Sequence, residues 1–103
     1  MRIILLILIS ACSNIKIPEV PIYGNYCGPG YPKSQNTAGD PIDDLDKSCK
    51  IHDECYAKMG YFNKNCDLEL IQDLKNSKID TVKQAVYRNL MSDYFISILR
   101  IRK

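Results

Sequence analysis

Apolar residues recur at helical spacing in the second half of the chain. Between residues 41 and 59 they are separated alternately by four and three positions, which places them on one helix face: Leu45, Cys49, His52, Tyr56 and Met59. Asp40 followed by Pro41 suits the start of this helix, because an acidic cap and a first-turn proline are both favoured there. Gly60 suits its end. We therefore predict a helix over residues 41–59 with this face turned inward.

Two further helices are predicted downstream. The first should begin near Asn65 or Cys66 and end around Asn76, with Asp67 on the stripe that it shares with Leu70, Ile71 and Leu74; Leu68 is its other apolar residue. The second should begin near Lys78 or Ile79. It is expected to be long and amphipathic, with a stripe of period close to 3.6 formed by Val82, Val86, Leu90, Tyr94 and Ile98.

The first third of the chain is predicted to be irregular, because residues 13–39 carry many prolines and glycines. With 103 residues the chain is long enough for one small domain, which usually needs a covalent or metal staple. A net charge of +2 gives no strong field, so a nucleic-acid partner is not expected. The charges are uneven: residues 40–73 hold nine acids and four lysines, and residues 75–103 hold seven bases and two acids.

Residues 1–11 have the order of an export signal: Met1 and Arg2, an apolar run over residues 3–9, then small residues before Cys12. The stretch over residues 8–12 resembles a bacterial lipobox, in which the signal is cut before the cysteine and the cysteine is lipidated. We predict a signal peptide over residues 1–11 and a domain over residues 12–103. The protein would be exported, either anchored to a membrane through lipidated Cys12 or secreted. Ordinary signal cleavage and a buried strand are the alternatives.

Four cysteines remain after Cys12, and an even number suggests two disulfides. Cys49 and Cys55 lie six residues apart on one predicted helix, about 9 Å of rise, which is too far for them to pair with each other. Two of the three possible connectivities stay open. We favour Cys27 with Cys49 and Cys55 with Cys66, which would bring a glycine-rich loop and Asp67 within one turn of His52.

His52 is the only histidine and lies between two of these cysteines. A lone histidine on an inward helix face is more often a hydrogen-bonded core residue than a catalyst, so its neighbours decide the interpretation. Asp53 projects about 100° further round the helix and would point to a separate ligand. The glycines of the loop over residues 23–30 let main-chain carbonyls turn inward together, which suits calcium.

Together these segments resemble the calcium loop and active-site signature of secreted phospholipases A2. The resemblance covers residues 23–67 and rests on Tyr26-Cys27-Gly28-Pro29-Gly30, on Pro41, Asp43 and Asp46, on Cys49-x-x-His52-Asp53-x-Cys55-Tyr56, and on Cys66-Asp67. It implies a mainly α phospholipase A2-like fold: two antiparallel disulfide-linked helices, an N-terminal calcium loop and a third, C-terminal helix.

The resemblance also implies calcium-dependent hydrolysis of the sn-2 ester of glycerophospholipids, with Ca²⁺ as cofactor and a phospholipid membrane or micelle surface as partner. His52 would be the general base, Asp67 would orient it, and Tyr56 would hydrogen-bond to Asp67. The calcium ligands would be the Asp53 carboxylate and the main-chain carbonyls of Tyr26, Gly28 and Gly30. The protein is expected to be a monomer.

Some family features are missing from the pattern. Many members carry further cysteines where this chain has Asn25, Ser48 and Glu54, and Tyr31 replaces a common glycine. The usual N-terminal helix and two-stranded wing are not recognisable, and Tyr61 is the candidate for a second tyrosine at Asp67. One alternative keeps the fold without turnover, as a calcium- or lipid-binding lipoprotein. Another is a zinc module built from Cys49, His52, Cys55 and Cys66.

Overall fold

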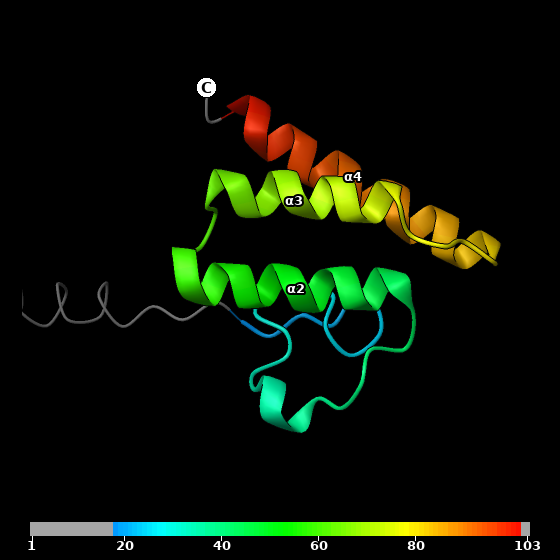
Figure 1. The fold of residues 1–103 in the computed structure, drawn as a ribbon, viewed down its shortest axis with the longest axis horizontal. Helices are drawn as coiled ribbons and strands as arrows, with labels where there is room; N and C mark the ends of the chain where they lie inside the picture. Colours follow the sequence, from blue (N-terminus) through cyan, green and yellow to red (C-terminus); the bar gives the residue numbers. More distant parts are fainter. Residues whose placement is uncertain (1–17, 102–103) are drawn as a thin grey trace, which may run out of the picture.

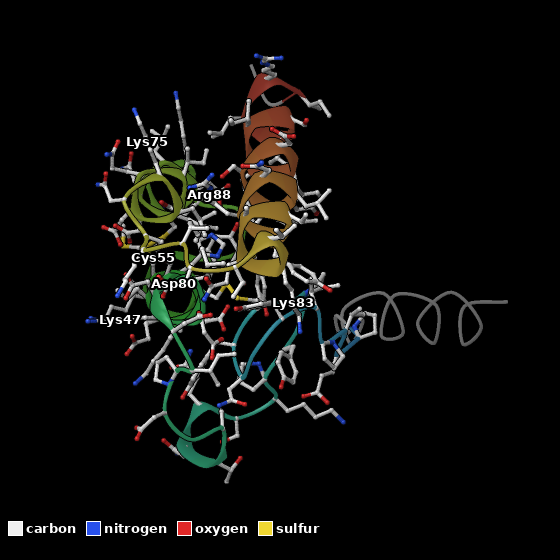
Figure 2. All side chains as sticks on the ribbon, turned by 90° about the vertical axis from the view of Figure 1, so that its right-hand side faces the viewer. Lys47, Cys55, Lys75, Asp80, Lys83 and Arg88 are labelled. Carbon is white, nitrogen blue, oxygen red and sulfur yellow. A yellow bond between two sulfur atoms is a disulfide. The ribbon has the colours of Figure 1, made fainter. Side chains whose placement is uncertain are left out.

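The computed structural model describes residues 18–101, which contain a single-turn 3-10 helix and three α-helices. These are η1 (Gln35–Thr37), α2 (Asp44–Met59), α3 (Lys64–Lys75) and α4 (Val82–Ile101). Helices α2 and α3 run side by side in opposite directions, and the irregular segment before them lies along α2 (Figure 1). Helix α4 lies across one face of this pair (Figure 2). The predicted signal peptide and Cys12 lie outside the described residues.

The mainly helical fold is confirmed, and two disulfides join its parts. Cys27 is bonded to Cys49, and Cys55 is bonded to Cys66. This is the favoured pairing, and the zinc module is wrong because all four sulfurs are used in these bonds. In residues 18–101 the only sheet-like pairing is an isolated antiparallel bridge between Tyr23 and Cys27, so this part of the chain has no two-stranded wing.

Helix α2 starts three residues later than predicted. Its cap is Asp43, which has an extended backbone and accepts the N–H of Asp46 at 2.9 Å, so Pro41 stays outside the helix. The N–H of Ile42 is also held away from helical geometry, because it donates to the Asp46 carboxylate at 2.9 Å. The predicted end is confirmed: Gly60, with a φ of 98°, donates its N–H to the carbonyl of Tyr56.

The inward faces of α2 and α3 are largely as predicted. Leu45, Cys49 and His52 are buried on α2, as are Leu70 and Leu74 on α3. Met59 is exposed, against the prediction, because the core gathers along the first half of α2 and does not reach its last turn. Leu68 is also exposed, since it lies about 200° from Leu70 around the helix.

Helix α4 begins at Val82, later than predicted, and its start is fixed by a capping box. The Thr81 hydroxyl accepts the N–H of Gln84, and the Gln84 side chain accepts the N–H of Thr81. Most of the predicted stripe is on the wrong side of the helix, because Val82, Val86, Leu90 and Tyr94 are exposed, whereas Ile98 is partly buried. The residues that pack against the core are Tyr87, Met91 and Phe95.

Helix α4 therefore has apolar residues on its packed side and also on an exposed side. It does not have the single apolar stripe that we predicted. Its spacing alone could not tell the packed side from the outward side. Among the described helices, none combines the length and the apolar character needed to cross a bilayer.

Candidate active site

His52 and Asp67 face each other across the α2–α3 contact. His52 lies in the middle of α2, Asp67 lies in the first turn of α3, and their side chains are joined by a 2.9 Å contact between Nε2 and Oδ1. Both are buried, with 7% of His52 and 0% of Asp67 exposed. The Cys55–Cys66 disulfide holds the two helices together within three residues of His52 and next to Asp67. The packing and the covalent bond thus place this pair jointly.

Two aromatic side chains surround the imidazole. The Tyr56 hydroxyl donates a hydrogen bond to Oδ1 of Asp67, the same oxygen that meets His52, and the Tyr56 ring centroid lies 4.1 Å from the imidazole centroid. Phe95 approaches from α4, edge on, with a centroid distance of 4.9 Å. Tyr61 lies against the ring of Tyr56 at 5.3 Å and is largely exposed. The role of Phe95 was not predicted, because no local signal links it to His52.

The protonation of His52 follows from these neighbours. Burial lowers the pKa of His52 below its usual value, and this effect outweighs the hydrogen bond and the charge of Asp67, which act in the opposite direction. The imidazole is therefore neutral at pH 7. Because a carboxylate oxygen accepts hydrogen bonds, Nε2 carries the ring proton, and Nδ1 keeps its lone pair. Such a group can take a proton from water.

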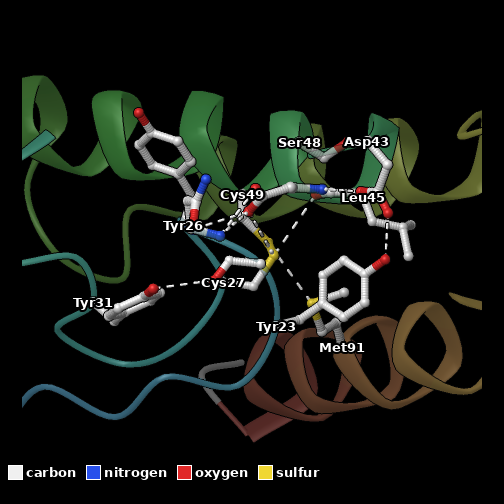
Figure 3. Close-up of a disulfide and its surroundings, with 12 residues drawn as sticks. Tyr23, Tyr26, Cys27, Tyr31, Asp43, Leu45, Ser48, Cys49 and Met91 are labelled. Carbon is white, nitrogen blue, oxygen red and sulfur yellow. Dashed lines mark hydrogen bonds between the residues drawn. A yellow bond between two sulfur atoms is a disulfide. The ribbon is translucent and has the colours of Figure 1, made fainter. Parts of the chain in front are cut away.

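The loop over residues 23–31 is attached to the first half of α2, one turn before His52. Its covalent attachment is the Cys27–Cys49 disulfide, which Figure 3 shows between the loop and the helix. Gly28 has a φ of 145°, and a Cβ there would come within 1.9 Å of the carbonyl oxygen of Val20, so only glycine fits. The Gly28 carbonyl also accepts the N–H of Tyr31 at 3.2 Å. This geometry makes the loop a tight, fixed turn.

Asp46 is the polar anchor of the same loop. Its carboxylate is 0% exposed and accepts the N–H of Tyr26 at 2.8 Å and that of Asn25 at 3.1 and 3.0 Å. With the bond from Ile42, three main-chain N–H groups converge on one buried carboxylate. A Cβ on Gly24 would fall within 2.7 Å of this carboxylate, so the loop approaches it closely. The sequence places both Asp46 and Tyr26 in the family signature, but it does not show that the Asp46 carboxylate accepts the N–H groups of Asn25 and Tyr26.

Asp53 follows His52 in the sequence but takes no part in its hydrogen bond with Asp67. Its Oδ2 atom is buried and has no hydrogen-bond partner in the described structure. Burial, followed by the negative charges of Asp46 and Glu54, raises the pKa of Asp53 to about 8. An unpaired, buried carboxylate oxygen is unfavourable unless a cation or a proton compensates it. This oxygen fits a metal ion.

The donor set available around Asp53 suits a hard cation. Side chains alone would not form this site, because residues 18–101 contain no cluster of three or more His, Cys, Asp or Glu side chains that could hold a metal. A site here would combine the Asp53 carboxylate with the predicted main-chain carbonyls of Tyr26, Gly28 and Gly30. Oxygen-only ligands of this kind are those that calcium prefers.

Sequence comparisons find a family model and two relatives that resemble this chain. The sequence model described as phospholipase A2 matches residues 5–93. The taipoxin gamma chain of Oxyuranus scutellatus scutellatus, named an acidic phospholipase A2 homolog, is 60% identical over 38 residues, which are 37% of this chain and 21% of that protein. The textilotoxin D chain of Pseudonaja textilis, also named an acidic phospholipase A2 homolog, is 55% identical over 38 residues, with the same shares. The match thus spans about a fifth of either relative. No solved structure matches.

Proposed function

The chain belongs to the phospholipase A2 family, and from this premise we propose that it hydrolyses the sn-2 ester of glycerophospholipids, releasing a fatty acid and a lysophospholipid in a calcium-dependent reaction. The observation that carries the proposal is the buried hydrogen bond between His52 and Asp67. It sits beside an unpaired carboxylate oxygen of Asp53. A base that activates water and a cation ligand that holds a metal ion near the ester can together serve ester hydrolysis.

In this proposal His52 acts as the general base. Nδ1 of His52 takes a proton from water as the water oxygen attacks the ester carbonyl carbon, and the same proton then goes to the departing glycerol oxygen. Asp67 holds the imidazole in the tautomer that leaves Nδ1 free, and Tyr56 fixes the carboxylate of Asp67. General-base catalysis of this kind contributes roughly 10²- to 10⁴-fold to the rate.

We assign the cation site to Asp53 and to the carbonyls of Tyr26, Gly28 and Gly30. When bound there, calcium would supply the positive charge that holds the lipid phosphate and polarises the ester carbonyl. The N–H of Gly28 would donate to the developing oxyanion. Asp46 and the Cys27–Cys49 disulfide support this assignment, because both fix the loop against α2.

We further propose that the protein is exported and works at a phospholipid surface. Two disulfides suit an oxidising compartment, where calcium is also abundant. A signal peptide over residues 1–11 and lipidation of Cys12 would keep the protein at a membrane; otherwise it would be secreted. One acyl chain alone anchors a protein only marginally, so a second membrane contact is expected.

The experiment that tests this function measures fatty-acid release from mixed phospholipid vesicles, first with calcium and then with a chelator. We expect release that needs calcium and is lost in His52→Gln and in Asp53→Lys. Release that persists in His52→Gln would remove the base from the mechanism. Release that persists in Asp53→Lys or in chelator would remove the cation.

A second candidate function is a calcium- or lipid-binding protein with this fold and no turnover. Two observations favour it: both relatives are named phospholipase A2 homologs, and Phe95 lies directly against the imidazole. This candidate predicts calcium binding without any release of fatty acid. The same vesicle assay, combined with a calcium-binding measurement, separates the two functions.

A further inference from the structure

Helix α4 carries a second apolar side that nothing in the described structure covers. Its members are spaced mostly four residues apart and are between 49% and 83% exposed: Val82, Val86, Leu90, Tyr94 and Ile101. We call this set the outer face of α4. It belongs to an ordered helix of 20 residues, whose other side is packed in the core through Tyr87, Met91 and Phe95.

The two sides are set by the register of the helix. Val86, Leu90 and Tyr94 each precede a packed residue by one position, which rotates them by about 100° around the axis. The outer face extends from one end of the helix to the other, about 28 Å. A row of large exposed apolar side chains along a whole helix is typical of an interaction surface, whereas an ordinary surface carries such residues singly.

The charged residues near the outer face indicate which kind of surface it would bind. Lys83 and Arg100 flank it near its two ends, and Asp93 is the one acid among the described residues of α4. The sequence continues beyond α4 with Arg102 and Lys103, and residues 75–103 together contain seven bases and two acids. An apolar helix face bordered by basic residues fits an anionic lipid surface, with the helix lying in the plane of the headgroups.

We propose that the outer face of α4 is the surface by which this protein docks on anionic phospholipid membranes. The inference rests on the proposed function, since it names the surface that would bring the site to its lipid. Phe95 touches His52 from the packed side of the same helix. Docking through the outer face would therefore hold the imidazole at about one helix diameter plus the 4.9 Å between the two rings, roughly 15 Å, from the lipid.

A fluorescence experiment tests the docking directly, because the chain has no tryptophan. Tyr94→Trp places a single reporter on the outer face, and Met59→Trp places one at an equally exposed apolar position in the last turn of α2. Both are made in His52→Gln protein and mixed, in chelator, with vesicles of phosphatidylglycerol or of phosphatidylcholine. We expect a blue shift for Tyr94→Trp with phosphatidylglycerol and a much smaller shift for Met59→Trp. Equal shifts at both positions would overturn the proposal.

A vesicle flotation assay measures how much the outer face contributes. The variant Val86→Ser/Leu90→Gln should bind phosphatidylglycerol vesicles about 10- to 100-fold more weakly, since two apolar side chains lose their burial in lipid. Its melting temperature should not change, because both side chains are exposed in the fold. Unchanged binding by this variant would contradict the proposal. A second result would also contradict it: light scattering shows a wild-type dimer that the two substitutions abolish, and the wild type does not float with vesicles. The outer face would then be the contact between two copies of the chain.

Failure of the docking and failure of the proposed function give different results. Hydrolysis of a dispersed short-chain phospholipid without vesicle binding would overturn the docking and leave the enzyme intact. A Tyr94→Trp blue shift and vesicle flotation of the wild type, without any hydrolysis of these vesicles by the wild type in calcium, would support the docking and overturn the proposed function.

Discussion

One disulfide joins α2 to α3, next to the His52–Asp67 pair, and the other joins α2 to the loop over residues 23–31. The polar groups of these two regions differ in how many of them have a hydrogen-bond partner. Nε2 of His52 and the Tyr56 hydroxyl both meet Asp67, so the base is hydrogen-bonded within the protein. The loop is anchored to Asp46, but the neighbouring Oδ2 of Asp53 is buried without a partner. The pair proposed as the base is held by protein hydrogen bonds, whereas no described protein group compensates Oδ2 of Asp53.

If calcium binds as proposed, this difference predicts which properties of each region change with the ion. The geometry of the base should be the same with and without the ion, because protein groups supply all of its contacts. The stability of the cation region should rise when the ion binds, because the ion compensates the charge of Asp53. Variants of the His52–Asp67 pair and variants of the loop region should therefore respond differently to a chelator.

The largest effect is expected from the anchor of the loop. Asp46→Ala leaves the N–H groups of Asn25, Tyr26 and Ile42 without their acceptor, and should lower the free energy of unfolding by about 3–5 kcal/mol. Urea unfolding measures it. Asp40→Ala, an exposed carboxylate on the same stretch, is the control and should change stability by less than about 0.5 kcal/mol. Similar losses in the two variants would show that Asp46 is not an anchor.

The second-largest effect is expected from the two disulfides, which attach different regions to α2. Replacing either pair of cysteines by serine should cost about 3 kcal/mol, with the Cys27–Cys49 pair costing about 0.6 kcal/mol more because it closes 22 residues instead of 11. Loss of Cys27–Cys49 should weaken calcium binding, and loss of Cys55–Cys66 should mainly reduce turnover at saturating calcium. Calorimetric unfolding and calcium titration measure the two effects. The comparison fails if both pairs alter calcium affinity equally.

A smaller effect, of opposite sign, is expected at Asp53. Its pKa is about 8 in the folded protein and 3.8 when unfolded, so the folded state keeps a proton that the unfolded state releases between about pH 4 and pH 8. In chelator, stability should therefore fall as the pH rises through this window. Asp53→Asn should abolish that slope and stabilise the protein at pH 8 by about 1–3 kcal/mol.

The Asp53 prediction is checked by melting temperatures in chelator at pH 5 and pH 8. Glu54→Gln, an exposed neighbour, is the control and should keep most of the slope. Calcium should raise the melting temperature of the wild type and leave that of Asp53→Asn unchanged. A wild-type slope that survives in Asp53→Asn would mean that another group causes it.

The smallest effect concerns the support of the base. Tyr56→Phe removes the hydrogen bond to Oδ1 of Asp67 and should cost about 1 kcal/mol, or about fivefold in the rate of hydrolysis if the whole loss falls on the transition state. The calcium affinity should stay the same. Tyr61→Phe, on the exposed ring beside Tyr56, should change neither quantity.

The sequence predicted the parts of the fold that local chemistry determines. The inward face of α2, the cap at Gly60 and the position of Asp67 on the apolar side of α3 all follow from spacing and residue type. The start of α2 could not be predicted, because the Asp46 carboxylate competes with helical geometry for the N–H of Ile42. That contact is visible only once residues 24–26 are folded against α2.

Helix α4 marks the limit of periodicity as a guide. The residues with the most regular spacing, Val82, Val86, Leu90 and Tyr94, are exposed, and the less obvious set of Tyr87, Met91 and Phe95 is packed. A helix that is apolar on two sides gives no pattern from which to choose the core side. The contact of Phe95 with His52, 43 positions earlier, depends on that choice.

The most direct test of the account is an NMR titration of the single histidine, with and without calcium. In chelator we expect the imidazole proton on Nε2 and a pKa below 6.5, because burial lowers the pKa of His52. Added calcium should shift the amide signals of residues 26–31 and leave the tautomer unchanged. A proton on Nδ1 in chelator, a pKa above 6.5 there, or loop signals that do not change with calcium would contradict the proposal that a preassembled base lies beside a calcium site.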